Sequence, residues 1–174
     1  ELVHDMLASI SSGSAAWPAR LEDLIAARAR RLPAPARELL ELLTVAARPV
    51  AGEVVLGLLD RPAAVRGALH QLSVARLVRA GRSERGELIE VYHDRIRETV
   101  LAGLDPERQR ACHRRLANAL LALPADERGE PEILAHHLHA AGDTEGALQH
   151  MALAARRAGE AMAFARAAEL ALAA

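Results

Sequence analysis

Histidine is the residue type in this chain with the widest choice of chemistry. Three of the eight histidines lie almost together, at His136, His137 and His139. On a helix, His136 and His139 would share a face, and imidazole is a good zinc ligand. The sequence has no second cysteine and no nearby pair of carboxylates to complete a tetrahedral set. We therefore predict no metal site here.

A second candidate for chemistry is the adjacent pair Cys112 and His113. A cysteine nucleophile needs a histidine that faces it and a third group that orients the histidine. Neighbours on a helix point in different directions, so we predict no catalytic pair. A single cysteine also excludes an internal disulfide. We expect Cys112 to be a small core residue and the chain to be cytoplasmic.

The absence of lysine limits the reactions available to the chain. All 22 basic residues are arginine, so there is no phosphate-binding Walker lysine and no Schiff base. No predicted strand ends in paired acids that could hold magnesium. We therefore predict that this chain is not an enzyme and by itself binds neither ATP nor ADP tightly. It needs no cofactor of its own.

Arginine is concentrated in residues 61–86, which have a formal charge of +5 from six arginines and Glu84. The candidates for contact with an anion or a partner are Arg66, Arg76, Arg79, Arg82 and Arg85. If the segment binds DNA, a helix over 62–73 would enter the major groove and the arginines after it would reach phosphates. The other interpretations are contact with another protein domain or subunit, or solvated charge.

Helices must position most of these residues. The 174 residues are 51% hydrophobic and have a net charge of −1, enough apolar material for one domain or two small ones. Apolar residues recur every three or four positions, which predicts a mainly α fold. The expected helices cover 18–31, 36–47, 51–59, 62–73, 94–104, 106–123, 131–141 and 144–158, with a last segment over 160–174 and the end of another helix over 2–10.

One segment lacks the helical spacing of apolar residues. Apolar residues at 77–78 and at 88–92 flank a polar turn at 82–86, which predicts a single β-hairpin. Three short helices followed by two strands is the order of a winged-helix unit. Aspartates before helices are expected to act as caps at Asp60, Asp94, Asp105 and Asp143.

The chain offers little else for binding nucleic acid or membrane. Its three aromatic residues are Trp17, Tyr92 and Phe164, too few for the stacking surface of a single-strand binder. No stretch approaches the roughly 18 apolar residues of a membrane span. The first residues have no signal-peptide layout, and the abrupt beginning at Glu1 suggests an excised fragment.

Three stretches of the sequence resemble a known family. They are LEDLIAAR at 21–28 with LPAPARELL at 32–40, VYHDRIRE at 91–98, and HRRLA at 113–117. They resemble the region after the nucleotide domain in bacterial STAND-type, AAA-like ATPases attached to serine/threonine kinases, nucleotide cyclases or LuxR-type activators. The resemblance implies the end of the ATPase lid and a linker helix over 1–32, a winged helix over 33–104 and the beginning of a tetratricopeptide-like (TPR-like) array of helical hairpins over 105–174.

The most specific part of the resemblance is the pair His93 and Asp94. It is similar to the His-Asp pair of NB-ARC and apoptotic ATPases, with Tyr92 where methionine or leucine is usual. The resemblance implies that His93 contacts the phosphates of ADP and holds the winged helix against the nucleotide domain, while Asp94 caps the next helix. It also makes the histidines at 136–139 packing residues at the start of the array.

The function implied is that of a non-catalytic regulatory module. It would couple the nucleotide state to protein partners bound by the repeats, and the parent protein would bind ATP or ADP with magnesium. Its first partner would be the nucleotide-binding domain of the same polypeptide, and no membrane is expected. The alternatives are a DNA-binding winged-helix transcription regulator and a generic helical adaptor.

Overall fold

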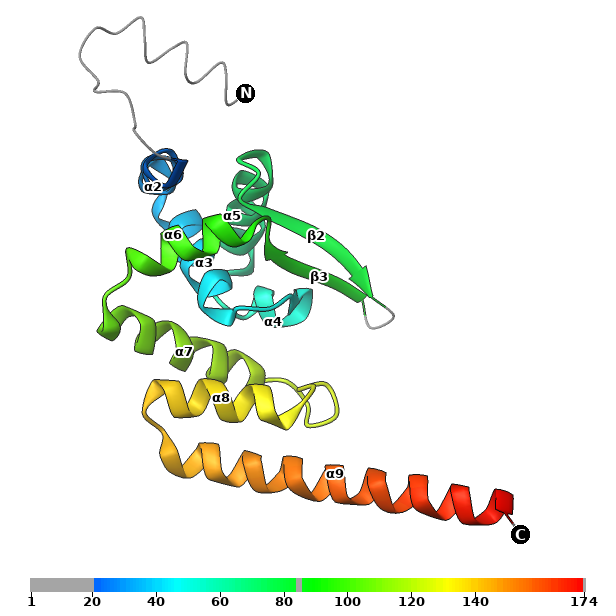
Figure 1. The fold of residues 1–174 in the computed structure, drawn as a ribbon. Coiled ribbons are helices and arrows are strands. Elements are labelled where there is room, and N and C mark those ends of the chain that lie inside the picture. Colours follow the sequence, from blue (N-terminus) through cyan, green and yellow to red (C-terminus); the bar gives the residue numbers. More distant parts are fainter. Residues whose placement is uncertain (1–20, 84–85, 174) are drawn as a thin grey trace, which may run out of the picture.

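The computed structural model describes residues 21–83 and 86–173, which form eight helices and one three-stranded antiparallel sheet (Figure 1). The elements are α2 (Leu21–Arg31), α3 (Ala34–Ala46), β1 (Val50–Ala51), α4 (Gly52–Leu56), α5 (Pro62–Val74), β2 (Val78–Ser83), β3 (Gly86–Val91), α6 (Asp94–Ala102), α7 (Pro106–Leu121), α8 (Pro131–Ala141) and α9 (Thr144–Ala173). The mainly helical class is confirmed. The predictions for residues 2–18 and for Arg85 lie outside the described residues.

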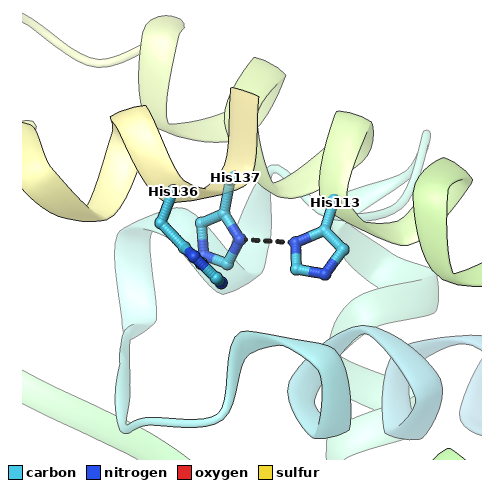
Figure 2. A group of neighbouring side chains, drawn as sticks. All are labelled: His113, His136 and His137. Carbon is cyan, nitrogen blue, oxygen red and sulfur yellow. Dashed lines mark hydrogen bonds between the residues drawn. The ribbon is translucent and has the colours of Figure 1, made fainter. Parts of the chain in front are cut away.

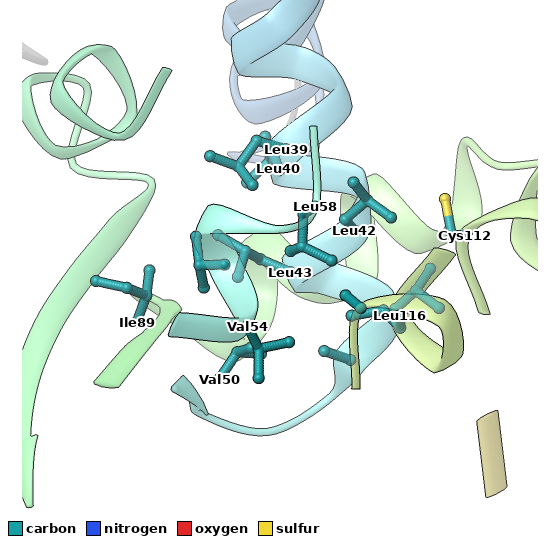
Figure 3. Close-up of a cluster of buried hydrophobic side chains, with 14 of the residues drawn as sticks. Leu39, Leu40, Leu42, Leu43, Val50, Val54, Leu58, Ile89, Cys112 and Leu116 are labelled. Carbon is teal, nitrogen blue, oxygen red and sulfur yellow. The ribbon is translucent and has the colours of Figure 1, made fainter. Parts of the chain in front are cut away.

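Helix α3 lies at the centre of the molecule. Pro35 in its first turn fixes a helical φ without losing a backbone hydrogen bond, because the first N–H groups of a helix have no partner in the helix. Leu39, Leu40 and Leu43 then follow at helical spacing and are almost fully buried. They pack with side chains from α4, α7 and β3 (Figure 3). This cluster fixes where α6 and α7 can lie, because both helices contact α3.

The predicted hairpin is confirmed. Strands β2 and β3 pair in antiparallel register, with Val78 opposite Val91, and Ile89 and Val91 of β3 point into the core. Strand β1 adds a third strand on the far side of β3, with Val50 opposite Ile89. The sequence prediction of a helix over 51–59 was therefore too long. Pro49 favours extended backbone just before β1, and the short helix α4 ends at Leu56, with Gly57 as its C-cap.

Two of the predicted caps are confirmed. The Asp105 carboxylate accepts from the Arg108 backbone N–H at 2.8 Å, and that of Asp143 accepts from the Gly146 N–H at 2.9 Å. Each satisfies an N–H group that the first helical turn leaves unpaired. These caps set where α7 and α9 begin.

The predicted cap at Asp60 is wrong. Arg61 is the N-cap of α5 and its side chain makes no capping hydrogen bond. Because Pro62 is the first helical residue, Asp60 lies one position too early to reach the free N–H groups.

The helix break predicted near residue 159 is also absent, since α9 continues through Gly159. The surrounding alanines are strong helix formers, and they outweigh the cost of one glycine.

The last three helices extend the core. Helix α7 packs on α3, α8 packs on α7, and α9 packs on α8 (Figure 1). Leu116 of α7 and Leu134 and Leu138 of α8 belong to the same buried cluster as α3. The far half of α9 extends past the end of α8. Within the described residues, none of the helices combines the length and the low polarity needed to cross a bilayer.

Candidate functional site

The first candidate site lies at the junction between β3 and α6. Beyond the last strand residue, Tyr92 N–H donates to the Leu77 carbonyl at 2.9 Å, so the pairing of the hairpin continues up to the residue before His93. His93 has an extended backbone and is the N-cap of α6. Its Nδ1 accepts from the Arg95 backbone N–H at 3.2 Å. Hydrogen bonds to the hairpin before it and to the helix after it therefore fix the backbone at this junction.

The cap of α6 is His93, and the prediction that Asp94 caps this helix was wrong. Asp94 is the first residue inside the helix, where its carboxylate cannot reach back to the free N–H groups as an N-cap does. Its Oδ1 lies 3.3 Å from the Arg97 guanidinium. Asp94 still places negative charge at the positive end of the helix dipole.

The cap determines which nitrogen of His93 is available. Because Nδ1 accepts a hydrogen bond, it needs its lone pair, and the proton of the neutral ring is assigned to Nε2. The side chain is exposed. His93 is therefore an exposed residue with one ring nitrogen held by the backbone and the other left as an N–H donor. Such a donor suits an anionic oxygen.

The surroundings of His93 have both signs of charge. Arg95, the next basic side chain, lies 3.3 Å from Glu22 of α2 and 3.5 Å from Glu98 of α6. The pair with Glu22 ties α2 to the same end of α6 as His93. A negatively charged ligand at this junction would therefore compete with carboxylates for Arg95.

The arginines predicted as anion or partner contacts lie on several elements. All four of those described are exposed, with Arg66 on α5, Arg76 in the α5–β2 connection, and Arg79 and Arg82 on β2. Arg79 is not free, because its guanidinium lies 2.7 Å from Glu90 on the opposite strand and 6.0 Å from the centre of the Tyr92 ring.

A second cluster, which the sequence did not predict, consists of His113, His136 and His137. His113 projects from α7, and the other two project from α8 toward it (Figure 2). The Nδ1 atoms of His113 and His137 are 2.9 Å apart, and one ring nitrogen from each of the three lies within 4.8 Å of the others. The predicted partner of His136, His139, is exposed and outside the cluster. The third histidine of the cluster comes from α7.

The three rings of this histidine cluster differ in burial. His137 is 2% exposed, His113 is half-buried and His136 is exposed. Burial, together with the neighbouring charges of His113, His136 and Arg48, lowers the pKa of His137 to about 4. Burial and the charge of His136 also lower the pKa of His113. Both buried rings are thus neutral at pH 7, and one must donate to the other.

Cys112 and His113 point apart, as predicted. Cys112 is 2% exposed and packs in the leucine core (Figure 3). Burial raises the pKa of its thiol. A thiol without a facing histidine and with a raised pKa is a poor nucleophile, so Cys112 is a core residue.

An ion network joins α7 to α3. Arg108 of α7 bonds Glu41 of α3 at 2.7 Å. About two turns further along α7, Arg115 bonds Glu38 of α3 and donates to the Leu58 carbonyl at 2.6 Å. The sequence did not reveal these pairs, because they depend on how two distant helices pack. They fix the angle at which α7 leaves the first part of the molecule.

Comparisons of the chain with family models, with curated proteins and with solved structures each found no match.

Proposed function

We propose that this chain is a non-catalytic regulatory module of a STAND-type signalling ATPase. In it, α3–α5 and the β2–β3 hairpin form a winged helix, and α7–α9 begin a TPR-like array. The observation that supports this best is the exposed side chain of His93, which follows a paired strand at a helix start and whose Nδ1 accepts from the backbone, so that Nε2 is left as the N–H donor. This is the geometry a sensor of a bound diphosphate needs.

The proposed contact is strong enough to shift an equilibrium between two conformations. A hydrogen bond from an imidazole N–H to a charged oxygen contributes about 1.5–3 kcal/mol. That energy shifts a switch only if it differs between the ADP and the ATP state, since equal contact in both would change nothing. We therefore infer that His93 contacts the phosphates of ADP in the nucleotide-binding domain of the same polypeptide and loses the contact when ATP and magnesium replace ADP.

A route from His93 to the helical array passes through α3. Helix α6, which His93 caps, contacts α3, and α3 contacts α7. The second contact combines shared core residues with the bonds of Arg108 and Arg115 to glutamates of α3. A displacement of α6 would thus act on α7 through a rigid helix.

The array would then offer a surface to protein partners. Helix α9 leaves several large apolar side chains in solvent: Leu148, Met151, Met162 and Phe164. Leu148 and Met162 are 66% and 74% exposed. Apolar surface of this kind favours protein contact. Further helical hairpins or a partner protein would cover it.

Nucleotide release from the complete protein tests the sensing role. His93→Asp keeps a good N-cap but replaces the donor with a like-charged acceptor, so folding is preserved and the phosphate contact is lost. We expect ADP to dissociate about 10–100-fold faster and basal activity to rise. His70→Ala, which removes an exposed histidine on α5, should leave release unchanged. Equal release from His93→Asp and the wild type would contradict the proposal.

The isolated chain should retain no nucleotide. It has no lysine and so no Walker sequence, and one histidine donor supplies too little free energy to hold ADP. Calorimetry should detect no binding of ADP or ATP. Micromolar affinity would place the nucleotide site inside this chain and overturn the division of roles.

A DNA-binding winged-helix regulator is the second candidate. The exposed side of α5 presents Arg66, His70 and Gln71, the positions a recognition helix would use. Duplex DNA binding that weakens steeply with salt, and that Arg66→Ala reduces, would favour this function. Absence of both DNA binding and nucleotide sensing would leave a generic helical adaptor.

A further inference from the structure

We propose that His113, His136 and His137 form a binding site for a divalent transition-metal ion of the zinc type, which joins α7 to α8. The site is independent of the function proposed for His93. It uses one ligand from α7 and two from α8 (Figure 2).

The distances fit after a small adjustment. Zinc bonds imidazole nitrogen at about 2.0–2.1 Å, so two nitrogens of a tetrahedral site lie about 3.4 Å apart. The Nδ1 atoms of His113 and His137 are 2.9 Å apart, and the three ring nitrogens lie within 4.8 Å of one another. To close the set, the His136 ring would have to rotate toward the other two, and its exposed position leaves it room to do so.

The arrangement of lone pairs also favours a metal ion. In its absence, the two facing Nδ1 atoms share one proton in a hydrogen bond. A metal ion takes the place of that proton and accepts a lone pair from each Nδ1. The displaced proton moves through solvent to the Nε2 of the same ring, so both imidazoles stay neutral. Three imidazoles with no thiolate select zinc, copper or nickel over calcium and magnesium. Water would fill the fourth position.

Packing alone accounts for His137, but it does not account for His136. His137 fills space between the helices and has a hydrogen-bond partner. His136 lies largely in solvent, yet its ring centre is 5.5 Å from that of His113 and 5.3 Å from that of His137. Core packing does not hold this exposed ring, and its edge-to-face contact with His113 keeps it within reach of a ligand shared by all three.

One nearby charge opposes the ion. Arg48 acts on His137 as a positive neighbour. Its guanidinium lies 3.7 Å from the Glu130 carboxylate, which offsets part of that charge. Glu130 precedes α8 and is not among the ligands of the site.

Zinc titration of the complete chain, stripped with a chelator, tests the proposal. Calorimetry should show one strong ion per chain, and saturating zinc at about 100 times Kd should raise Tm by about 5–10 °C. His136→Ala removes an exposed ligand and should fold normally. It should weaken binding at least tenfold and abolish most of the Tm rise.

The matched control is His139→Ala, since His139 is exposed on the same helix and lies outside the cluster. It should bind zinc as the wild type does. His113→Gln gives a second test from α7 and should also weaken binding. Zinc binding that survives both His136→Ala and His113→Gln unchanged, or no strong zinc binding to the wild type, would overturn the site and leave a hydrogen-bonded packing cluster.

Discussion

His93 and His137 are the same residue type held in opposite surroundings. The backbone holds one nitrogen of His93, whose side chain is exposed. His137 is enclosed between α7 and α8, where its partners are other histidines. A ring fixed at the surface suits a ligand brought by another domain. A ring enclosed among imidazoles suits a small ion or a shared proton. Location in the fold, rather than residue type, separates the two roles.

The largest effect on stability is expected from a substitution in the core between the two sites. Leu116 is 1% exposed and links α7 to α3, so Leu116→Ala should lower the free energy of unfolding by about 2–5 kcal/mol. Denaturant unfolding should remain one transition, because both regions share this core. Leu148→Ala, at an exposed position of α9, should change stability by less than about 0.5 kcal/mol. Two separate transitions in the wild type would show that the regions fold independently.

Low pH should destabilise the folded chain through protonation of His137. Its pKa is lowered from 6.5 to about 4 in the folded state, so the unfolded chain binds more protons between these values. The free energy of unfolding should therefore fall as pH decreases from about 6.5 to 4, by about 3 kcal/mol at most. The groups that face the ring are His113, His136 and Arg48, and all oppose its protonation.

His137→Leu removes this titration while still filling the space. Denaturant unfolding across the pH range should show a flatter profile for the variant than for the wild type. Parallel profiles would mean that His137 takes up its proton in the folded state as readily as in the unfolded chain.

Substitutions of His93 test its role as the N-cap of α6. His93→Ala should lower the free energy of unfolding by about 1 kcal/mol, because it leaves a helix N–H unpaired. His93→Asp should leave stability near that of the wild type, since aspartate is a preferred cap. Chemical unfolding measures both. If alanine and aspartate behave alike, the Nδ1 hydrogen bond of His93 has no capping role.

The smallest expected effect concerns the hairpin. Arg79 and Glu90 are an exposed cross-strand pair, so Arg79→Gln should cost about 0.5 kcal/mol at low salt and less at high salt. A loss of partner binding without a matching loss of stability would show that Arg79 serves recognition. A stability loss above about 2 kcal/mol would mean that the hairpin depends on this pair.

Local signals were sufficient to predict the hairpin, the start of α7 at Asp105 and that of α9 at Asp143. Each depends on residues within a few positions of one another. The cap of α6 was missed by one residue, because both His93 and Asp94 can accept from a backbone N–H, and only the backbone angles decide between them.

Long-range features escaped sequence analysis for a different reason. The histidine cluster joins residues 24 positions apart, and α3 and α7 are joined by pairs 67 and 77 positions apart. Helical periodicity shows which side of a helix is apolar, but it does not give the rotation and offset at which two helices pack. The buried state of His137 and the third ring from His113 both depend on that offset.

We propose above all that the Nε2–H of His93 contacts the phosphates of ADP and not those of ATP. Histidine ¹⁵N NMR of the complete protein, assigned with His93→Asp, measures this directly. We predict that His93 has its proton on Nε2, that its Nε2 resonance moves when ADP is bound, and that it returns toward the value of the free ring when ATP and magnesium replace ADP. The same Nε2 resonance in both nucleotide states would contradict the account.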